Sequence, residues 1–226
     1  MSVVSPGLRD RVRGIATPVA LAMGRVGLTP NALTLIGFGG TVVAAVLAGL
    51  QAWLPAGVLV LVFGVFDMFD GTLARATGTA SRLGAFLDSV FDRWGEGIVY
   101  VGILWGTLEL GLSRPVILTG TAMVSAFMVS YARAKSEGLG FTAGTGMAAV
   151  GLAPREIRLV ILTIGLIAAG LLPGFPADMD QPGAAAYPLS ALALELALGL
   201  ITILATITVI QRILHVVNQN RKQENQ

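Results

Sequence analysis

Four aspartates stand in two closely spaced pairs in an otherwise apolar chain. Asp67 and Asp70 are spaced i, i+3, and Asp88 and Asp92 are spaced i, i+4. On a helix, either spacing places both carboxylates on one face, about one turn apart. Carboxylate oxygens suit a hard cation such as Mg²⁺ or Mn²⁺, and two such ions about 4 Å apart commonly support displacement at phosphorus. Two such helices, antiparallel and joined by a loop of about 13 residues, can aim the four carboxylates at one small volume. The two pairs therefore predict a metal site, with two ions, that acts on a phosphate.

Salt bridges are the alternative explanation for this acidic cluster. The segment 66–97 holds five carboxylates, the four aspartates and Glu96, against three arginines. The arginines are Arg75, Arg82 and Arg93. Asp67 comes only 13 residues after Leu54, roughly 20 Å of helix, so it lies at membrane depth, where an uncompensated charge is costly. Two negative charges stay without an arginine, and bound divalent cations would neutralise them.

Glu96 continues the face of Asp92 one turn deeper. It either pairs with Arg93 or Arg75 or takes part in the chemistry, and the sequence leaves both possibilities open. Near the carboxylates, Gly71 and Gly84 lack a Cβ and would let a ligand or a neighbouring helix come close.

The composition is that of a membrane protein. Of 226 residues, 54% are hydrophobic and only 12% are charged, and the mean hydropathy is +0.78, values outside the range of ordinary soluble domains. The chain has no cysteine, which excludes disulfides and thiolate chemistry. The net charge of +2 comes from basic residues dispersed between apolar runs, so no nucleic-acid partner is expected.

Hydropathy predicts an all-α integral membrane protein with six transmembrane helices plus an N-terminal juxtamembrane amphipathic helix. The amphipathic helix takes residues 1–27, the six-helix catalytic domain takes 28–217, and a polar tail that we expect to fray takes 218–226. The expected spans are about 32–50, 54–66, 84–108, 115–132, 154–172 and 189–211.

The distribution of basic residues predicts the orientation. Arginine and lysine concentrate in the N-terminal segment, the aspartate loop, the segment 133–158 and the tail, whereas the opposite loops hold only Arg114. By the positive-inside rule, the termini and the aspartates face the cytoplasm. We therefore expect a multi-pass protein of the cytoplasmic membrane whose active site opens to the cytoplasm.

The aspartates belong to a longer pattern that resembles the signature of the CDP-alcohol phosphotransferase family at every fixed position. The pattern here is Asp67-x2-Asp70-Gly71-x2-Ala74-Arg75-x8-Gly84-x3-Asp88-x3-Asp92. The resemblance implies an integral membrane enzyme with six transmembrane helices, a juxtamembrane N-terminal helix and a homodimeric assembly. It also implies a chemistry: a substituted phosphate moves from a CDP-linked donor, such as CDP-diacylglycerol, to an alcohol, and CMP is released.

The resemblance also implies residue roles. Asp67, Asp70 and Asp88 would hold the metals, and Asp92 would be both a ligand and the general base that removes the proton of the acceptor hydroxyl. The residues that would shape the nucleotide pocket are Gly71, Ala74, Arg75 and Gly84. For Arg75, a role as counter-ion to Asp67 or Asp70 is an equal alternative.

Four further basic residues lie on the same expected side as the aspartates: Arg133, Lys135, Arg155 and Arg158. They either follow the positive-inside rule or bind the phosphate of an acceptor through charge-assisted hydrogen bonds. Arg158 favours the second explanation, because it already stands inside an apolar run.

Within the family, this layout most resembles bacterial phosphatidylinositol-phosphate synthase and its archaeal ether-lipid relative. The resemblance implies inositol 1-phosphate as the acceptor. Pro154, just before the basic pair, departs from the acidic and arginine-rich opening that we associate with those enzymes. Glycerol 3-phosphate, serine or another alcohol therefore stays open as an acceptor.

Two other classes of function compete with an enzyme. A divalent-cation transporter would use intramembrane aspartates as a transit site, but these aspartates crowd toward the cytoplasmic end and not the middle of the bilayer. A catalytically idle scaffold gains nothing from four charges at that depth. The sequence thus favours a metal-dependent phosphatidyltransferase.

Overall fold

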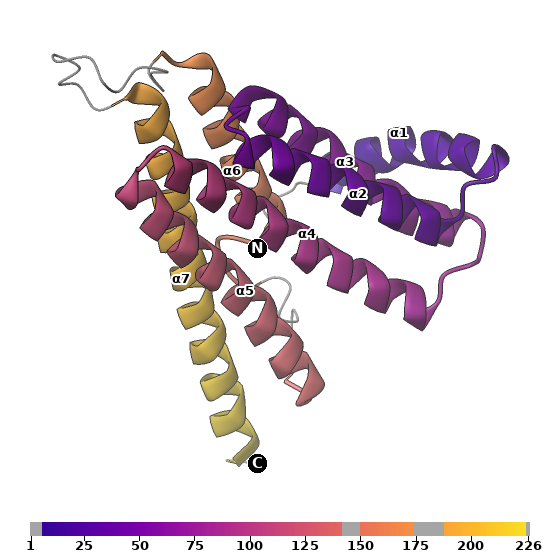
Figure 1. The fold of residues 1–226 in the computed structure, drawn as a ribbon. Coiled ribbons are helices and arrows are strands. Elements are labelled where there is room, and N and C mark those ends of the chain that lie inside the picture. Colours follow the sequence, from indigo (N-terminus) through magenta and orange to yellow (C-terminus); the bar gives the residue numbers. More distant parts are fainter. Residues whose placement is uncertain (1–5, 142–149, 174–187, 225–226) are drawn as a thin grey trace, which may run out of the picture.

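A computed structural model describes residues 6–141, 150–173 and 188–224, and every regular element in these ranges is an α-helix. Figure 1 shows how the helices are arranged. Their bounds are α1 (Pro6–Arg25), α2 (Pro30–Gly49), α3 (Trp53–Ala76), α4 (Arg82–Glu109), α5 (Ser113–Gly138), α6 (Arg155–Leu171) and α7 (Leu189–Glu224). The expected all-helical architecture is confirmed.

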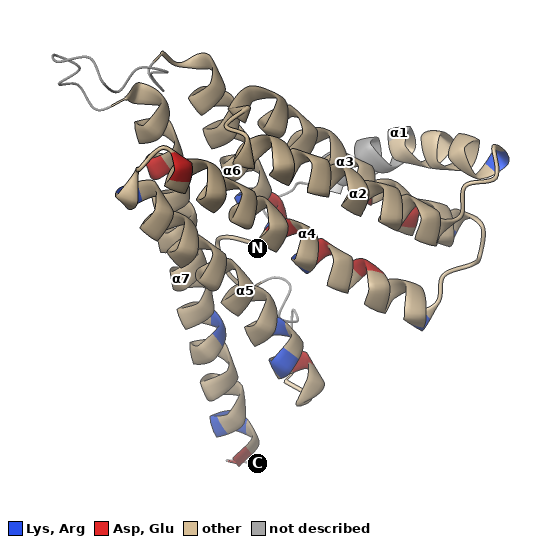
Figure 2. Cartoon of the chain, viewed as in Figure 1, with Lys and Arg blue, Asp and Glu red and all other residues tan. Residues whose placement is uncertain are grey.

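Four of these helices, α2, α3, α5 and α7, are long and apolar enough to cross a membrane. Figure 2 shows long stretches of them without a charged residue. Helix α4 has 28 residues but carries acidic and basic side chains along its first half, and α6 has 17 residues and opens with three charged ones. The protein is therefore an all-α membrane protein in which four helices meet the requirements for a span.

Helix α2 lies between the two helices that carry the aspartates. It packs against both α3 and α4, while α6 packs on α3 and α7, and α5 packs on α7 and α4 (Figure 1). The core forms where these helices cross, around fully buried side chains such as Ile103, Leu166 and Leu198. Both helices that carry the aspartates are thus positioned by α2.

Glycines set the distance between α2 and α4. A Cβ at Gly102 would overlap the backbone carbonyl of Ala45, and one at Gly106 would overlap the carbonyl of Ala48. These residues repeat every three or four positions, so they line one seam in which the helix backbones touch. The seam fixes the position of α4, and with it Asp88 and Asp92.

The connection from α3 to α4 is shorter than the sequence suggested. We expected a loop of about 13 residues between the aspartate helices, but α3 continues to Ala76 and α4 starts at Arg82, which leaves residues 77–81. Gly78 makes the turn with φ +68°. Ser81 then caps α4, because its hydroxyl accepts a hydrogen bond from the Gly84 N–H at 3.0 Å.

The two ends of the described chain are helical. The second half of α1 packs on α3 through a buried cluster of Ala20, Leu33 and Leu73. We expected residues 218–226 to fray, but α7 continues to Glu224, whose carboxylate accepts a hydrogen bond from the Asn220 side chain at 2.8 Å. Basic residues in the last turn also favour the helix through its dipole.

Candidate active site

Asp67 and Asp70 lie on the face of α3 that meets α2. The Thr34 hydroxyl of α2 donates to Asp70 Oδ2 at 2.6 Å, and the Gly71 backbone N–H donates to Asp70 Oδ1. A Cβ at Gly37 would lie 2.7 Å from Asp67 Oδ1, so the glycine makes room for this carboxylate. Helix α2 therefore forms one wall of the site.

Asp88 and Asp92 project from the first half of α4. Asp92 forms ion pairs with Arg155 at 2.9 Å and with Arg93 at 3.5 Å. Asp88 makes no hydrogen bond or ion pair with the residues that the structure describes, and it interacts electrostatically with Asp67 and Asp70. Like charges from two helices thus act on one another across the site.

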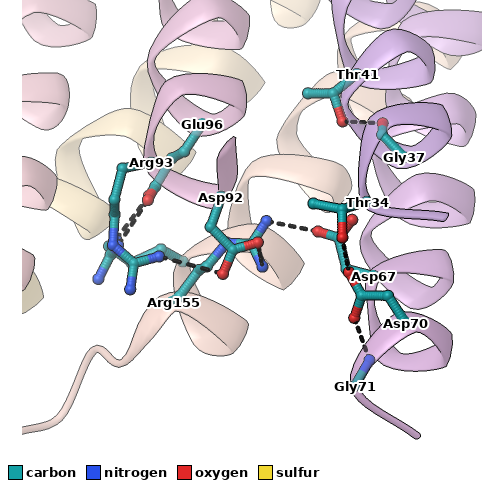
Figure 3. Close-up of polar contacts among 11 residues, drawn as sticks. Thr34, Gly37, Thr41, Asp67, Asp70, Gly71, Asp92, Arg93, Glu96 and Arg155 are labelled. Atoms are coloured by element: carbon teal, nitrogen blue, oxygen red, sulfur yellow. Dashed lines mark hydrogen bonds and ion pairs between the residues drawn. The ribbon is translucent and has the colours of Figure 1, made fainter. Parts of the chain in front are cut away.

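Arg155, the first residue of α6, joins the two aspartate pairs. Its Nη2 donates to Asp67 Oδ2 at 2.7 Å, and its Nη1 lies 2.9 Å from Asp92 Oδ1. Figure 3 shows the guanidinium between the two carboxylates. We expected Arg155 to face an acceptor phosphate, whereas the structure places it on two of the predicted metal ligands.

The four aspartates suit a divalent cation in chemistry and charge. A positively charged group, the Arg155 guanidinium, already spans Asp67 and Asp92, and all the donor atoms are hard carboxylate oxygens. Among the described residues, however, no three acidic, histidine or cysteine side chains are yet placed to hold one ion. The expected convergence of the four carboxylates on one small volume is therefore incomplete: Asp67 and Asp92 meet at the Arg155 guanidinium and not around a shared ion position.

A second carboxylate–arginine pair lies one turn deeper. Arg158 donates to both oxygens of Glu96 at 2.8 Å, and the two side chains are only 1% and 7% exposed. Arg158 also donates to the carbonyl of Ala153 at 2.9 Å. We expected Arg158 at an acceptor phosphate, and Glu96 either beside Arg93 or Arg75 or in the chemistry. The fold instead pairs Arg158 with Glu96, because each needs a partner in the protein interior.

The other predicted binding residues lie nearer the solvent-exposed helix ends. Arg133 pairs with Glu137 at 2.9 Å on the exposed end of α5, where Lys135 is also exposed. Arg75 donates a hydrogen bond to the Thr72 hydroxyl at 3.4 Å. Among the described residues it forms no ion pair with Asp67 or Asp70, so the alternative role as their counter-ion is not seen. Two of the four predicted acceptor residues, Arg133 and Lys135, are therefore open to solvent.

The predicted nucleotide-pocket glycines lie in different surroundings. A Cβ at Gly71 would come 3.2 Å from the Arg75 guanidinium. Gly84 lies in the first turn of α4, where a Cβ would stand 3.1 Å from the Ser81 hydroxyl. Ala74 is half-buried on α3. The helix cap at Ser81 thus gives Gly84 a structural task in addition to any contact with a ligand.

Sequence reasoning missed the contribution of α2. Thr34, Gly37 and Thr41 follow the i, i+3, i+7 spacing of one helix face, and Thr41 lines a cavity of about 20 Å³ with Asp67 and Arg155. Polar and small residues at helical spacing within an apolar run are the signal that would have found this face.

Arg212 of α7 was also missed. Its side chain is 4% exposed, and it donates to the carbonyl of Val129 on α5 and, at 3.1 Å, to that of Val150. An arginine within the apolar part of a long helix is the sequence signal, because such a charge needs a partner inside the protein. The residue ties α7 to α5 and to the segment before α6.

Comparison with known protein families accounts for this arrangement. The model of the family described as CDP-alcohol phosphatidyltransferase matches residues 27–217. The chain belongs to the CDP-alcohol phosphatidyltransferase family. The matched range contains all four aspartates and Arg155, and the family resemblance found in the sequence is confirmed.

The chain is similar to two curated proteins that are both named as inositol phosphate lipid synthases. Phosphatidylinositol phosphate synthase of Mycobacteroides abscessus is 36% identical over 166 residues, which cover 72% of each chain. Archaetidylinositol phosphate synthase of Pyrococcus horikoshii is 37% identical over 157 residues, which cover 70% of this chain and 79% of the relative.

Solved structures agree with the curated relatives. The crystal structure of Mycobacterium tuberculosis phosphatidylinositol phosphate synthase with CDP-DAG bound gives a TM-score of 0.73 at 31% identity, covering 89% of this chain and 93% of that one. The same synthase in complex with manganese and citrate gives a TM-score of 0.71 at 30% identity, covering 89% and 88%. The chain is thus a metal-dependent CDP-alcohol phosphatidyltransferase, which sets aside the transporter and the scaffold.

Proposed function

We propose that the protein transfers the phosphatidyl group of CDP-diacylglycerol to the hydroxyl of inositol 1-phosphate and releases CMP. The observation that carries this proposal is the likeness, over 89% of the chain, to a phosphatidylinositol phosphate synthase solved with CDP-DAG. The aspartate cluster adds chemical support, because a diphosphate donor needs cations to neutralise its charge.

In this proposal the four aspartates would hold two Mg²⁺ or Mn²⁺ ions, which would supply Lewis-acid stabilisation of the charge on the departing CMP. Thr34 orients Asp70 through the 2.6 Å hydrogen bond. Asp92 accepts the proton of the acceptor hydroxyl on its carboxylate. The residues that line the nucleotide pocket are Gly71, Ala74, Arg75 and Gly84.

The acceptor phosphate binds at the basic ends of α5 and α6. Arg133 and Lys135 are exposed there, and Arg155 lies at the first residue of α6 beside Asp92. Arg158 supports this site from beneath, since its ion pair with Glu96 fixes the first turn of α6. The phosphate thus comes next to the base that activates the acceptor.

We propose further that α4 and α6 cross the membrane with the four longer apolar helices, giving six spans in the domain 28–217. Helix α1 then lies along the membrane surface, within residues 1–27. Basic residues at the α3–α4 turn, at the end of α5 and in the last turn of α7 favour a cytoplasmic active site. By analogy with the family, the protein works as a homodimer.

The acceptor follows from what the relatives' names have in common. The bacterial and archaeal synthases differ in the lipid part of the name and share the inositol phosphate part. Glycerol 3-phosphate or serine would use the same aspartates, but serine offers no phosphate to the exposed cations of α5. Inositol 1-phosphate is therefore the acceptor that we favour.

An acceptor panel tests the proposal. The purified full-length chain is supplied with CDP-diacylglycerol, Mg²⁺ and one of inositol 1-phosphate, inositol, glycerol 3-phosphate or serine. CMP is measured by chromatography and the lipid by mass spectrometry. We expect metal-dependent CMP release with inositol 1-phosphate alone; release with only another acceptor, or with none, would refute the assignment.

A further inference from the structure

Arg155 uses both ends of its guanidinium on predicted metal ligands. One terminal nitrogen lies 2.7 Å from Asp67 on α3, and the other lies 2.9 Å from Asp92 on α4 (Figure 3). The Arg155 side chain is 21% exposed, and each aspartate is 18% exposed. Solvent therefore reaches all three groups, and the bridge can open without unfolding the protein.

The bridge and a metal ion compete for the same oxygens. Magnesium binds a carboxylate oxygen at about 2.0–2.1 Å and requires nearly ideal octahedral geometry. An N–H donor at hydrogen-bond distance from that oxygen takes up part of the coordination space, and its positive charge repels the ion. We therefore expect Asp67 and Asp92 to bind a divalent cation more weakly while Arg155 holds these oxygens.

The backbone just before Arg155 is held by hydrogen bonds, so we expect the Arg155 side chain, and not its backbone, to move. Arg158 binds Glu96 and the carbonyl of Ala153, and the Thr208 hydroxyl accepts the N–H groups of Leu152 and Ala153 at 3.0 and 2.9 Å. Arg155 Nε, in contrast, is buried without a hydrogen-bond partner among the described residues. A further acceptor, such as a phosphate oxygen, would satisfy it.

We propose that Arg155 is an internal counter-ion that the divalent metal displaces, and that the released guanidinium then holds the phosphate of the acceptor. In the metal-free protein, Arg155 neutralises Asp67 and Asp92. Metal loading removes that task and makes Arg155 available, so metal binding precedes tight binding of the acceptor phosphate. The inference rests on the proposed function only for the nature of the acceptor.

Manganese binding to the metal-free, full-length protein tests the first step. Free Mn²⁺ is followed by electron paramagnetic resonance, without lipid or acceptor. We expect Arg155→Ala to bind Mn²⁺ about tenfold tighter than the unchanged protein, because the ion no longer competes with charge-assisted hydrogen bonds. Arg155→Lys, which keeps the charge but loses the forked contact, should fall between the two.

Arg82→Gln is the matched control. It removes one exposed cation from the first turn of α4, six positions before Asp88, and this cation forms no ion pair with a carboxylate among the described residues. We expect its Mn²⁺ affinity to change less than about twofold. An equal gain in Arg82→Gln and Arg155→Ala, or no gain in Arg155→Ala, would overturn the proposal. If Arg155→Ala fails to fold, the comparison of Arg155→Lys with the unchanged protein decides.

The second step is tested by coupling. Binding of inositol 1-phosphate is measured by calorimetry with and without Mn²⁺. We expect Mn²⁺ to increase the affinity for inositol 1-phosphate at least fivefold. Inositol 1-phosphate should increase the affinity for Mn²⁺ by the same factor, because coupling between two sites is reciprocal. Arg155→Ala should lose this coupling; coupling that persists there would show direct contact between metal and phosphate and refute the role of Arg155.

Failure of the inference differs from failure of the proposed function. Tighter Mn²⁺ binding by Arg155→Ala, together with no CMP release from any acceptor, would refute the proposed function and support the counter-ion. CMP release with inositol 1-phosphate, together with unchanged Mn²⁺ affinity in Arg155→Ala, would do the reverse.

Discussion

Two carboxylate–arginine contacts stand one helical turn apart on the same pair of helices. Asp92 and Glu96 are i, i+4 on α4, and Arg155 and Arg158 are i, i+3 on α6. The outer contact is partly exposed, and its arginine is shared with Asp67, whereas the inner pair is 1% and 7% exposed and bidentate. The same residue types therefore form one contact that solvent can reach and one that is sealed in the protein interior. We infer that this difference in burial gives the two contacts different roles.

Solvent makes the outer contact exchangeable. Partly exposed ion pairs are worth less than fully buried ones, because water can replace part of each partner's interaction. Breaking a buried pair instead leaves an uncompensated charge, which costs about 3–5 kcal/mol. The outer contact can thus give way to ligands, while the inner pair holds α4 and α6 in register.

The largest effect that we expect is on turnover. Asp92→Asn should reduce CMP release by about 10³-fold, because it removes the proton acceptor but keeps the shape of the side chain. Its melting temperature should stay close to that of the unchanged protein, since the outer contact contributes little stability. Turnover is measured as CMP formed per folded molecule.

Glu96→Gln is the matched variant for this measurement. It makes the same carboxylate-to-amide change one turn deeper, and its turnover per folded molecule should stay within about tenfold of the starting value. Equal losses of turnover in the two variants would remove the functional distinction between the outer and inner contacts.

The next effect is on stability. Glu96→Gln should lower the free energy of unfolding by about 3 kcal/mol, because Arg158 stays buried without its counter-charge. Arg155→Gln should lower it by less than about 1 kcal/mol. Both values come from denaturant unfolding in detergent.

A double replacement sharpens this result. Glu96→Leu combined with Arg158→Met puts apolar side chains of similar length in place of the buried pair, and stability should return to within about 1 kcal/mol of the starting protein. If Arg155→Gln instead destabilises as much as Glu96→Gln, the outer contact is structural as well.

The smallest effect that we expect is on Mn²⁺ affinity, through the hydrogen bond from α2 to Asp70. Thr34→Val removes the 2.6 Å hydrogen bond to Asp70 and should weaken Mn²⁺ binding about tenfold, since partners behind a ligand orient it. Thr41→Val is the control, because among the described residues that hydroxyl donates only to the Gly37 carbonyl, at 3.0 Å. Its Mn²⁺ affinity should change less than twofold; similar losses in both variants would deny Thr34 a specific role.

The sequence contains most of what determines the helices, because their signals are local. Apolar runs set the middle of each helix, and Thr29 and Ser81 cap α2 and α4 through their own hydroxyls. The same local character explains the misjudged connection between α3 and α4: Gly78 and Ser81 signal a short turn, but the motif residues before them were taken for a loop.

The pairing of charges is not local and was not predictable from spacing. Arg155 meets Asp67 across 88 positions, and Arg158 meets Glu96 across 62. Which arginine meets which carboxylate depends on how α6 sits against α3 and α4, and no motif encodes that. The i, i+3 and i, i+4 spacings correctly placed each aspartate pair on its own helix face but left the distance between the two faces undetermined.

The glycine seam between α2 and α4 has a consequence for how a bulky lipid nucleotide enters. The backbones of α2 and α4 are in contact at Gly102 and Gly106, so α4 has no room to move closer to α2 or to rotate against it. Asp88 and Asp92 stand on the same helix, so we expect the backbone that carries them to move little when the substrate enters. We expect the part that moves to admit the substrate to be α6, which contributes the flexible side chain of Arg155 to the site and not closely packed backbone.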